Sequence, residues 1–466
     1  MDASIPAALL SSLQGTAGFE ESRFIAAQKS VPSISIRFNP HKPLANASNW
    51  SHANLIADSV PWCSDQGVYL KQRPSFTLDP WLHAGAYYVQ EASSQFLQQA
   101  LQQTVDLNKS LRVLDLCAAP GGKSTLIQSL LTSDSVLVSN EVIRTRVPVL
   151  MENLIKWGSG NVVVTQNDPA DFSSLTAFFD VVVVDAPCSG SGLFRKDPDA
   201  LNIWNPELVE HCRLRQQRIL KDVWPALRPG GVLLYSTCSF SREENEEMVD
   251  WIMQELDATD IPIKNNHEWN IVETHSSACG GSGYRFYPDR LKGEGFFLAA
   301  FKKSGEGISY KTTNASKQKQ KILPLPKGKA VDSLLEQVPA LKGWSSLLHQ
   351  DRALFMPQSL WEALPELQAN LYVRMAGLDV GSLMRDTWIP AHALAVSGLL
   401  NDGFPAVELD LENALNYLRR HPDFKLDEAH IGWTLMKYRG LGLGWVKLMG
   451  NRVNNYYPKE WRILHH

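Results

Sequence analysis

Residues 111–125 read LRVLDLCAAPGGKST, and this stretch decides the fold. An apolar run ends in Asp115, a turn of small residues follows from Cys117 to Gly122, and a helical pattern begins at once. Small residues let the backbone approach a ligand closely, and the first turn of a helix presents unpaired N–H donors. The stretch therefore predicts a strand, a ligand-binding turn and a helix.

Further apolar runs follow in the order typical of an α/β domain. They are SVLVSNEV (135–142), NVVVTQ (161–166), FDVVVVDAP (179–187) and VLLYSTCS (232–239), with helical patterns between them. This alternation predicts a mostly parallel, doubly wound α/β sheet of the Rossmann-like kind. In such a sheet ligands bind at the carboxyl ends of the strands.

Changes in patterning predict the domain boundaries. Residues 1–85 carry the alternating strand signal SISIRF and predict a small leading α/β domain, and 86–303 form the doubly wound domain. Residues 304–329 are rich in Lys, Ser, Thr, Asn, Gly and Pro and predict a linker. An intermediate region, 330–395, then precedes a last folded domain, 396–466.

Composition excludes several protein classes. Apolar residues make up 44% and charged residues 20%, which is typical of globular proteins and not of disordered chains or coiled coils. No apolar stretch has the length of a membrane span and no signal-like segment opens the chain, so we expect a cytoplasmic protein that does not contact membranes. Six cysteines without a C-x-x-C pair indicate reduced thiols and no metal site.

Charge is distributed unevenly along the chain. Up to Phe301 there are 24 basic and 33 acidic residues, and from Lys302 onward there are 21 and 16. An acidic body with a basic C-terminal part fits a protein that carries out its chemistry in one region and recruits a polyanion through another. Residues 437–462 hold six basic residues and one acidic, interleaved with aromatics that predict base stacking beside phosphate contacts: Trp445, Tyr456, Tyr457 and Trp461.

The glycine turn is open to two interpretations. A phosphate loop, G-x-x-x-x-G-K-[ST], fits Gly122, Lys123 and Ser124 but requires glycine where this chain has Cys117. The apolar run that closes in Asp185 would supply the acidic metal partner of an NTPase.

The second interpretation is a nucleoside-binding turn. Asp115 would anchor the turn, and Glu141, which ends the next strand about 25 residues on, would take the ribose hydroxyls. Together with Asp168 after the third strand, these acids lie at three successive strand ends. Because that edge binds ligands in open α/β sheets, the pattern favours a nucleoside cofactor.

Two cysteines follow the predicted fourth and fifth strands, and methylation of cytosine at carbon 5 would employ both of them. Cys188 and Cys238 lie in Pro, Ser and Gly surroundings at the ligand edge. Carbon 5 of cytosine becomes nucleophilic only after something adds at carbon 6, and a thiolate is the natural nucleophile. Asp185 would act as the acid toward N3, and the second thiol would assist the later elimination. The remaining cysteines are expected to be inert: Cys63, Cys117, Cys212 and Cys279.

Three motifs in register resemble the RNA cytosine-5 methyltransferases of the Nol1/Nop2/Sun family. They are DLCAAPGGKST, DAPCSGSGLFRKDP and YSTCSFSREENEEMVDW, and the upstream YYVQEASSQF is similar to that family's lead-in to its cofactor domain. The resemblance implies a class I methyltransferase domain that uses S-adenosylmethionine.

The resemblance also implies roles for individual residues. Cys238 matches the nucleophile, Cys188 matches the residue that assists release, and Lys123 is placed to reach the target base. Arg195 lies where the family carries a basic residue, close to cofactor or RNA. The implied cofactor residues are Cys117, Ala118, Ala119, Pro120, Gly121, Gly122, Lys123, Ser124, Glu141 on the ribose, Asp168 near the adenine and Asp185 at the floor of the site.

The layout of the whole chain is similar to the bacterial 16S rRNA methyltransferases of this family. SIRFNPHKP and VPWCSDQGVYL resemble their N-terminal RNA-binding segment, and GLGLGWVKLMGNRVNNYYPKEWRIL resembles their C-terminal PUA-like domain. The implied activity is methylation of cytosine C5 in 16S rRNA by a monomeric enzyme that recruits ribosomal RNA. A tRNA substrate is the nearest alternative, and a phosphate-loop NTPase or a catalytically silent RNA-binding module are distant ones.

Overall fold

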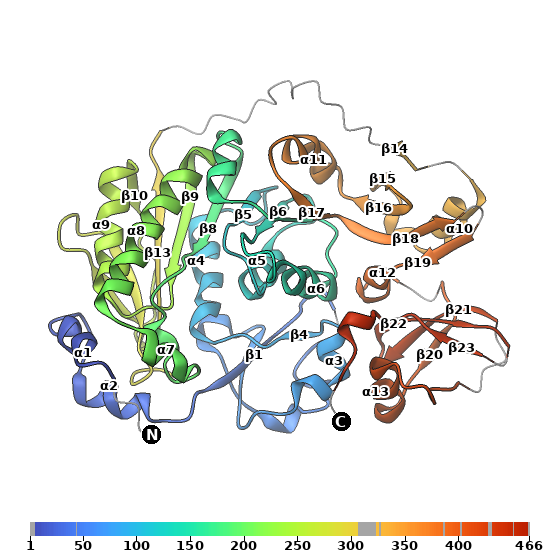
Figure 1. Cartoon of the computed structure of the whole chain (residues 1–466), viewed down its shortest axis with the longest axis horizontal. Coiled ribbons are helices and arrows are strands. Elements are labelled where there is room, and N and C mark those ends of the chain that lie inside the picture. Colours follow the sequence, from blue (N-terminus) through green and yellow to red (C-terminus); the bar gives the residue numbers. More distant parts are fainter. Residues whose placement is uncertain are drawn as a thin grey trace.

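The computed structural model describes residues 5–42, 44–305, 323–325, 328–384, 387–400, 403–426, 431–450 and 452–464. Most of the predicted linker, 306–322 and 326–327, lies outside these residues. Within the described ranges, no helix has the length and apolar character that crossing a membrane requires. In Figure 1 the central sheet lies at the left and centre, the N-terminal part lies below it, and the C-terminal part lies to the right.

A ten-stranded sheet forms the centre of the fold (Figure 1). Its order is β11-β12-β13-β9-β8-β5-β6-β7-β17, and β10 pairs with β13. The five strands from β9 to β7 run parallel, as predicted. The strands are β5 (Arg112–Asp115), β6 (Val136–Asn140), β7 (Val162–Thr165), β8 (Phe179–Asp185), β9 (Leu227–Thr237), β10 (Ala258–Asp260), β11 (Val272–His275), β12 (Ser282–Phe286), β13 (Phe296–Lys303) and β17 (Val373–Ala376).

The sheet is more mixed than the apolar runs predicted. Strands β10 to β13 and β17 all pair antiparallel with their neighbours. The chain between β11 and β13 has no crossover helix, and a parallel pair needs one, so these strands can only return antiparallel. The α/β class and the Rossmann-like order of the parallel strands are confirmed, with an antiparallel extension at each edge.

Helices cover both faces of the sheet, which explains the continuous apolar runs. In β8, Val181 and Val183 pack in one core with α4, α5 and α6, while Val182 and Val184 pack in the other with α8 and α9. A strand buried on both faces cannot alternate apolar with polar residues. The helices are α4 (Leu97–Thr104), α5 (Gly122–Leu130), α6 (Val147–Trp157), α7 (Pro198–Ile203), α8 (Pro206–Val223) and α9 (Glu246–Glu255).

The N-terminal part forms a four-stranded antiparallel sheet in the order β2-β3-β1-β4. Its strand β1 lies within the predicted SISIRF segment, and buried Arg37 donates to Gln90 Oε1 at 2.7 Å and to Thr125 Oγ1 of α5 at 2.7 Å. These bonds attach the sheet to the helix that follows the glycine turn. The elements are α1 (Ala7–Leu13), α2 (Glu21–Gln28), β1 (Ile34–Phe38), β2 (Ile56–Ser59), β3 (Gly67–Leu70), α3 (Pro80–His83) and β4 (Tyr87–Tyr88).

The C-terminal part holds two further sheets, ordered β14-β15-β16-β18-β19 and β20-β21-β22-β23. Strand β17 lies between β16 and β18 in the chain but pairs with β7, so one strand of the predicted intermediate region, 330–395, extends the central sheet; the domain boundaries given above stay a prediction. The elements are β14 (Leu323–Pro324), α10 (Lys329–Gln337), β15 (Ser345–His349), β16 (Arg352–Met356), α11 (Gln358–Asn370), β18 (Leu378–Met384), β19 (Thr387–Pro390), α12 (His392–Val396), β20 (Ala406–Glu408), α13 (Leu411–Arg419), β21 (Gly432–Tyr438), β22 (Leu441–Leu448) and β23 (Val453–Asn455).

The predicted stacking role of the C-terminal aromatics is wrong for two of them. Trp445 is buried in a core of the C-terminal part, and Tyr457 is buried in a core that the C-terminal and N-terminal parts share. Trp445 Nε1 donates to Ala391 O at 2.9 Å, and the Tyr457 hydroxyl lies 3.1 Å from Nδ1 of His83 in α3. Tyr456 is 41% exposed, so it keeps a face for stacking.

Candidate active site

The parallel strands bring the predicted residues to one edge of the sheet. Asp115 ends β5 and pairs in register with Ser139 of β6, while Asp185 ends β8 and pairs with Ser236 of β9. Cys238 follows β9 directly. The loops after four neighbouring strands therefore surround one site.

The glycine turn is held closed by a buried chain of polar groups. Ser139 Oγ donates to Ser124 Oγ at 2.9 Å, and Ser124 Oγ donates to Asp115 Oδ2 at 2.6 Å. Gly121 has φ +116°, a conformation that favours glycine, and Gly122 opens α5. A side chain on Gly122 would place its Cβ 3.2 Å from the Tyr88 ring, so the ring would have to move by a few tenths of an ångström to accommodate it.

These residues fit a nucleoside cofactor. The turn lines a pocket of about 170 Å³ that extends from Tyr88 to Lys123 and Asp185. Asp115 Oδ1 is buried and has no hydrogen-bond partner among the described residues, so it is free to accept from a ligand. Burial raises the pKa of Asp115 to about 7.

Glu141 and Asp168 differ in their burial and in their hydrogen bonds. Glu141 is buried; its Oε1 accepts from the backbone N of Ile143 at 2.8 Å and its Oε2 lies 3.3 Å from Arg146. Asp168 lies in the loop after β7, and its side chain is 43% exposed. It accepts a hydrogen bond from the backbone N of Ala170 at 3.1 Å. Glu141 is thus the more rigid hydrogen-bond acceptor of the two.

Lys123 and Asp185 form an ion pair inside the site. Lys123 Nζ lies 2.7 Å from Asp185 Oδ2, and Ser236 Oγ donates to Asp185 Oδ1 at 2.8 Å. Burial alone would lower the pKa of Lys123, but the charge and hydrogen bond of Asp185, together with the charges of Asp115 and Cys238, outweigh it and the pKa is raised. The pair offers both a proton donor and a carboxylate within the pocket.

The two thiols meet across the ends of β8 and β9. Cys188 Sγ and Cys238 Sγ are 3.1 Å apart. The hydrogen bond to Cys238, together with burial, raises the pKa of Cys188 well above its ordinary value. Gly192 N donates to Cys238 O at 2.8 Å, and a Cβ on Gly192 would lie 2.6 Å from that oxygen, so glycine is required for this approach.

Three family models match successive parts of the chain. The "N-terminal domain of 16S rRNA methyltransferase RsmF" matches residues 5–92, "16S rRNA methyltransferase RsmB/F" matches 102–302, and "Methyltransferase RsmF PUA domain" matches 404–463. The ribosomal RNA small subunit methyltransferase F of Aeromonas hydrophila is 31% identical over 413 residues, covering 86% of this chain and 85% of that protein. The enzyme of the same name from Aliivibrio salmonicida is 30% identical over 98% of this chain and 97% of its own.

The chain belongs to the RsmB/F family of 16S rRNA methyltransferases. The predicted enzyme class, an rRNA methyltransferase dependent on S-adenosylmethionine, is confirmed with it, and the phosphate-loop NTPase is excluded. A methyltransferase homolog protein from Pyrococcus horikoshii is 27% identical, with a TM-score of 0.51 over 64% of this chain and all of that one. The structure of NSun6 from the same organism, 18% identical, has a TM-score of 0.52 and shares the fold.

In this RsmB/F methyltransferase Arg195 does not face the site. Its guanidinium donates to Glu294 at 2.8 Å, to Gly293 O, to Ala27 O and to Ser30 Oγ. These acceptors use all five of its N–H groups. The expected contact of Arg195 with cofactor or RNA is therefore wrong, and the residue ties the end of α2 to the segment before β13.

One buried acid of the family's third motif escaped the sequence analysis. Glu244 lies in the charged run Arg242–Glu247, a composition typical of an exposed helix start. In the structure it is fully buried and accepts hydrogen bonds from the loops of both thiols. No local pattern distinguishes it from Glu247 of the same run, which is exposed.

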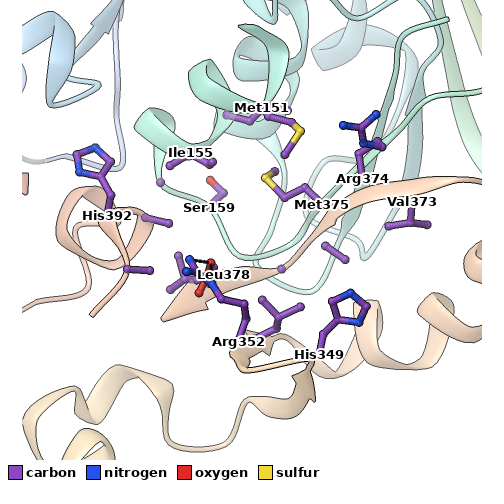
Figure 2. Close-up of a pocket in the computed structure, with 18 of the residues that line it drawn as sticks. Met151, Ile155, Ser159, His349, Arg352, Val373, Arg374, Met375, Leu378 and His392 are labelled. Carbon is purple, nitrogen blue, oxygen red and sulfur yellow. Dashed lines mark hydrogen bonds and ion pairs between the residues drawn. The ribbon is translucent and has the colours of Figure 1, made fainter. Parts of the chain in front are cut away.

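A second pocket lies away from the thiols. It has a volume of about 390 Å³ and is lined mainly by apolar residues of α6, β17, β18 and the adjacent loops. Met151 of α6 and Met375 of β17 lie opposite one another across it, and Arg352 is at its far side (Figure 2). None of the predicted site residues of this RsmB/F methyltransferase lines the pocket.

Proposed function

We propose that the protein methylates carbon 5 of a cytosine in 16S rRNA through a covalent bond between Cys238 and carbon 6. The observation that carries the proposal is the 3.1 Å separation of Cys188 and Cys238, beside the ion pair of Lys123 and Asp185. Methylation of an exocyclic amine needs no thiol, and here two thiols lie at the ligand edge. S-adenosylmethionine, when bound, supplies the electrophilic methyl group.

The first step is addition of the Cys238 thiolate to carbon 6. The sulfur–carbon bond forms, the 5,6 double bond opens, and negative charge builds up on the ring at N3 and O2. The ion pair of Lys123 Nζ and Asp185 Oδ2 lies in the same pocket and would supply a proton to N3, which neutralises that charge. Carbon 5 is then nucleophilic and takes the methyl group.

The second step restores the aromatic ring. The proton on carbon 5 leaves, its electron pair re-forms the 5,6 double bond, and the bond to Cys238 Sγ breaks. Cys188 lies next to that sulfur, and its raised pKa keeps it a thiol. It would accept the carbon 5 proton as it passes its own proton to the leaving sulfur of Cys238, and N3 would return its proton to the pair of Lys123 and Asp185. We assign the release of product to Cys188 on this basis.

The proposed cofactor residues lie at or after the ends of the parallel strands and in the turn that lines the pocket. We propose that Glu141 accepts from the ribose hydroxyls, that Asp168 lies near the adenine, and that Asp115 Oδ1 accepts from the ligand. The turn from Cys117 to Ser124 would surround the amino-acid part of the cofactor, since the pocket that it lines leads to Lys123. The small residues of the turn and the helix N-terminus suit close backbone contact.

The target must be accessible to a thiol. A cytosine stacked in a duplex cannot be reached, so the enzyme acts on an unpaired or flipped nucleotide, which costs a few kcal/mol of unstacking. The basic C-terminal part, 396–466, and the leading domain, 1–85, would supply affinity for the RNA backbone. The proposal includes a monomeric enzyme that acts in the cytoplasm.

The test is to map the product. Full-length enzyme, S-adenosylmethionine and either 16S rRNA or total tRNA are incubated, and nuclease digests are analysed by mass spectrometry for 5-methylcytidine. We expect 5-methylcytidine at one position of 16S rRNA with the wild type and none with Cys238→Ser. Methylation of tRNA alone, a methylated exocyclic amine, or full activity of Cys238→Ser would refute the proposal.

A further inference from the structure

One buried carboxylate connects the loops that carry the two thiols. Glu244 lies in the short turn Arg242–Glu244, between β9 and α9. Its Oε1 accepts from the backbone N of Ser189 at 2.9 Å and from Gln216 Nε2 at 3.1 Å. Its Oε2 accepts from Ser189 Oγ and from Ser239 Oγ, both at 2.5 Å. Each carboxylate oxygen therefore has two donors.

The two serines follow the two thiols directly in the chain. Ser189 is the residue after Cys188, and Ser239 is the residue after Cys238. Because one carboxylate holds both serines, it links the two loops, in addition to the hydrogen bond from Gly192 N to Cys238 O at 2.8 Å. The sulfur atoms that these loops carry are 3.1 Å apart.

The two loops do not depend on Glu244 equally. The loop of Cys238 keeps other supports, since Thr237 Oγ1 donates to Asn245 Oδ1 at 2.6 Å and Asn245 Nδ2 donates to Ser239 O at 2.8 Å. The loop of Cys188 is also bound by Gln216 Nε2 at Pro187 O, 3.0 Å, and by Phe240 N at Ser191 Oγ, 2.8 Å, but Ser189, which follows Cys188 directly, directs both its N–H and its hydroxyl at Glu244. Loss of the carboxylate would thus release Cys188 more than Cys238.

The negative charge of the Glu244 carboxylate also acts on Cys188. All four donors are neutral groups, and burial raises the pKa of the Glu244 carboxyl. Burying a carboxylate costs free energy that its hydrogen bonds must offset. The largest causes of the raised pKa of Cys188 are the hydrogen bond to Cys238, burial and the charge of Cys238, and the charge of Glu244 raises this pKa further. Lys123, in contrast, interacts with the nucleophile Cys238.

We propose that Glu244 is a positioning residue that holds Cys188 beside Cys238 for release of the product. The proposal rests on the two-thiol mechanism above and adds a group that touches neither RNA nor cofactor. It predicts that weakening Glu244 impairs elimination more than addition. The covalent complex should then accumulate.

The test compares full-length Glu244→Gln with wild type and with Asp250→Asn. The glutamine keeps the size but replaces one acceptor oxygen with a donor. Asp250 of α9 also accepts two backbone hydrogen bonds, from Ala278 and Cys279, but contacts neither thiol loop, so it is the matched control. Steady-state turnover, single-turnover adduct formation and binding of S-adenosylhomocysteine are measured with 16S rRNA.

We expect turnover of Glu244→Gln to fall about 100-fold, the cost of misplacing a reacting group by about 1 Å. Adduct formation and S-adenosylhomocysteine binding should stay near wild type, and RNA should remain bound to the variant on a denaturing gel. Asp250→Asn should show none of these effects. Unchanged turnover, or an equal fall in adduct formation and turnover without accumulation, would overturn the proposal.

A second measurement separates this inference from the mechanism. Diamide takes two electrons and two protons from a pair of adjacent thiols and leaves a disulfide, so the rate of the Cys188–Cys238 crosslink reports their proximity without RNA. Peptide mass spectrometry should show a crosslink at least about tenfold slower in Glu244→Gln than in wild type, as lost proximity predicts. An unchanged rate overturns the role of Glu244 even where the mechanism holds. Absence of an adduct with Cys188→Ala would instead refute the mechanism and leave the crosslinking result standing.

Discussion

Replacing Gly192 by alanine should disturb the thiols through the backbone alone. The new Cβ would lie 2.5 Å from Gly295 O and 2.6 Å from Cys238 O, where an ordinary C···O contact is about 3.3 Å. Both obstacles are backbone, so the chain must shift by about 0.7 Å. The bond from Gly192 N to Cys238 O, 2.8 Å long, lies in the same contact. The shift therefore displaces Cys238 itself.

The expected cost is about 1–3 kcal/mol of stability, which is typical of overpacking, and about a 100-fold loss of kcat from displaced reacting atoms. The assay is thermal denaturation together with transfer of labelled methyl to 16S rRNA. Gly190→Ala is the control: Gly190 has φ +75° and no atom within 4 Å of the added Cβ, so it should lose about 1–2 kcal/mol from strain and keep its kcat within a few-fold. Wild-type kcat in Gly192→Ala would refute the reasoning.

Three further predictions concern the remaining parts of the site. Burial raises the pKa of Asp115 from 3.8 to about 7, so the folded chain holds a proton that the unfolded chain has released. The free energy of unfolding should therefore fall between about pH 4 and pH 7 in wild type relative to Asp115→Asn, and parallel curves from urea titrations would contradict this. Glu141→Gln should weaken binding of S-adenosylhomocysteine about tenfold in calorimetry, as expected for a charged hydrogen bond of about 1.5–3 kcal/mol; an unchanged Kd would exclude the ribose contact. The double change Tyr456→Ala with Lys447→Ser should weaken rRNA binding and flatten its salt dependence, and equal slopes in filter binding would remove this surface from the RNA interface.

Sequence patterns predicted the parts of this fold that depend on local structure. The strand Phe179–Asp185 is buried on both faces, so its apolar residues are consecutive and visible. Parallel strands share one carboxyl edge, and so Asp115, Asp185 and Cys238 could be placed together before any coordinates. The structure adds the distances: Asp185 Oδ2 lies 2.7 Å from Lys123 Nζ, and Cys238 Sγ lies 3.1 Å from Cys188 Sγ.

Long-range pairing and burial were not predictable in the same way. Strand Val373–Ala376 joins the central sheet beside β7 across about 200 residues of chain, and nothing in its four residues indicates that partner. Trp445 is interleaved with basic residues in the sequence, yet in β22 its side chain lies on the face of the strand that packs into the core. Glu244 is one acid in a charged run, and only the arrival of Ser189 and Ser239 from two loops reveals its role.

The central claim is that Cys238 bonds to the RNA and Cys188 releases it. The most direct measurement mixes full-length Cys188→Ala with labelled 16S rRNA and S-adenosylmethionine and resolves the products on a denaturing gel, beside the double variant Cys188→Ala/Cys238→Ala. The account predicts that the single variant retains RNA through denaturation and that the double variant does not. RNA retained by both variants, or by neither while wild type still transfers methyl groups, would contradict it.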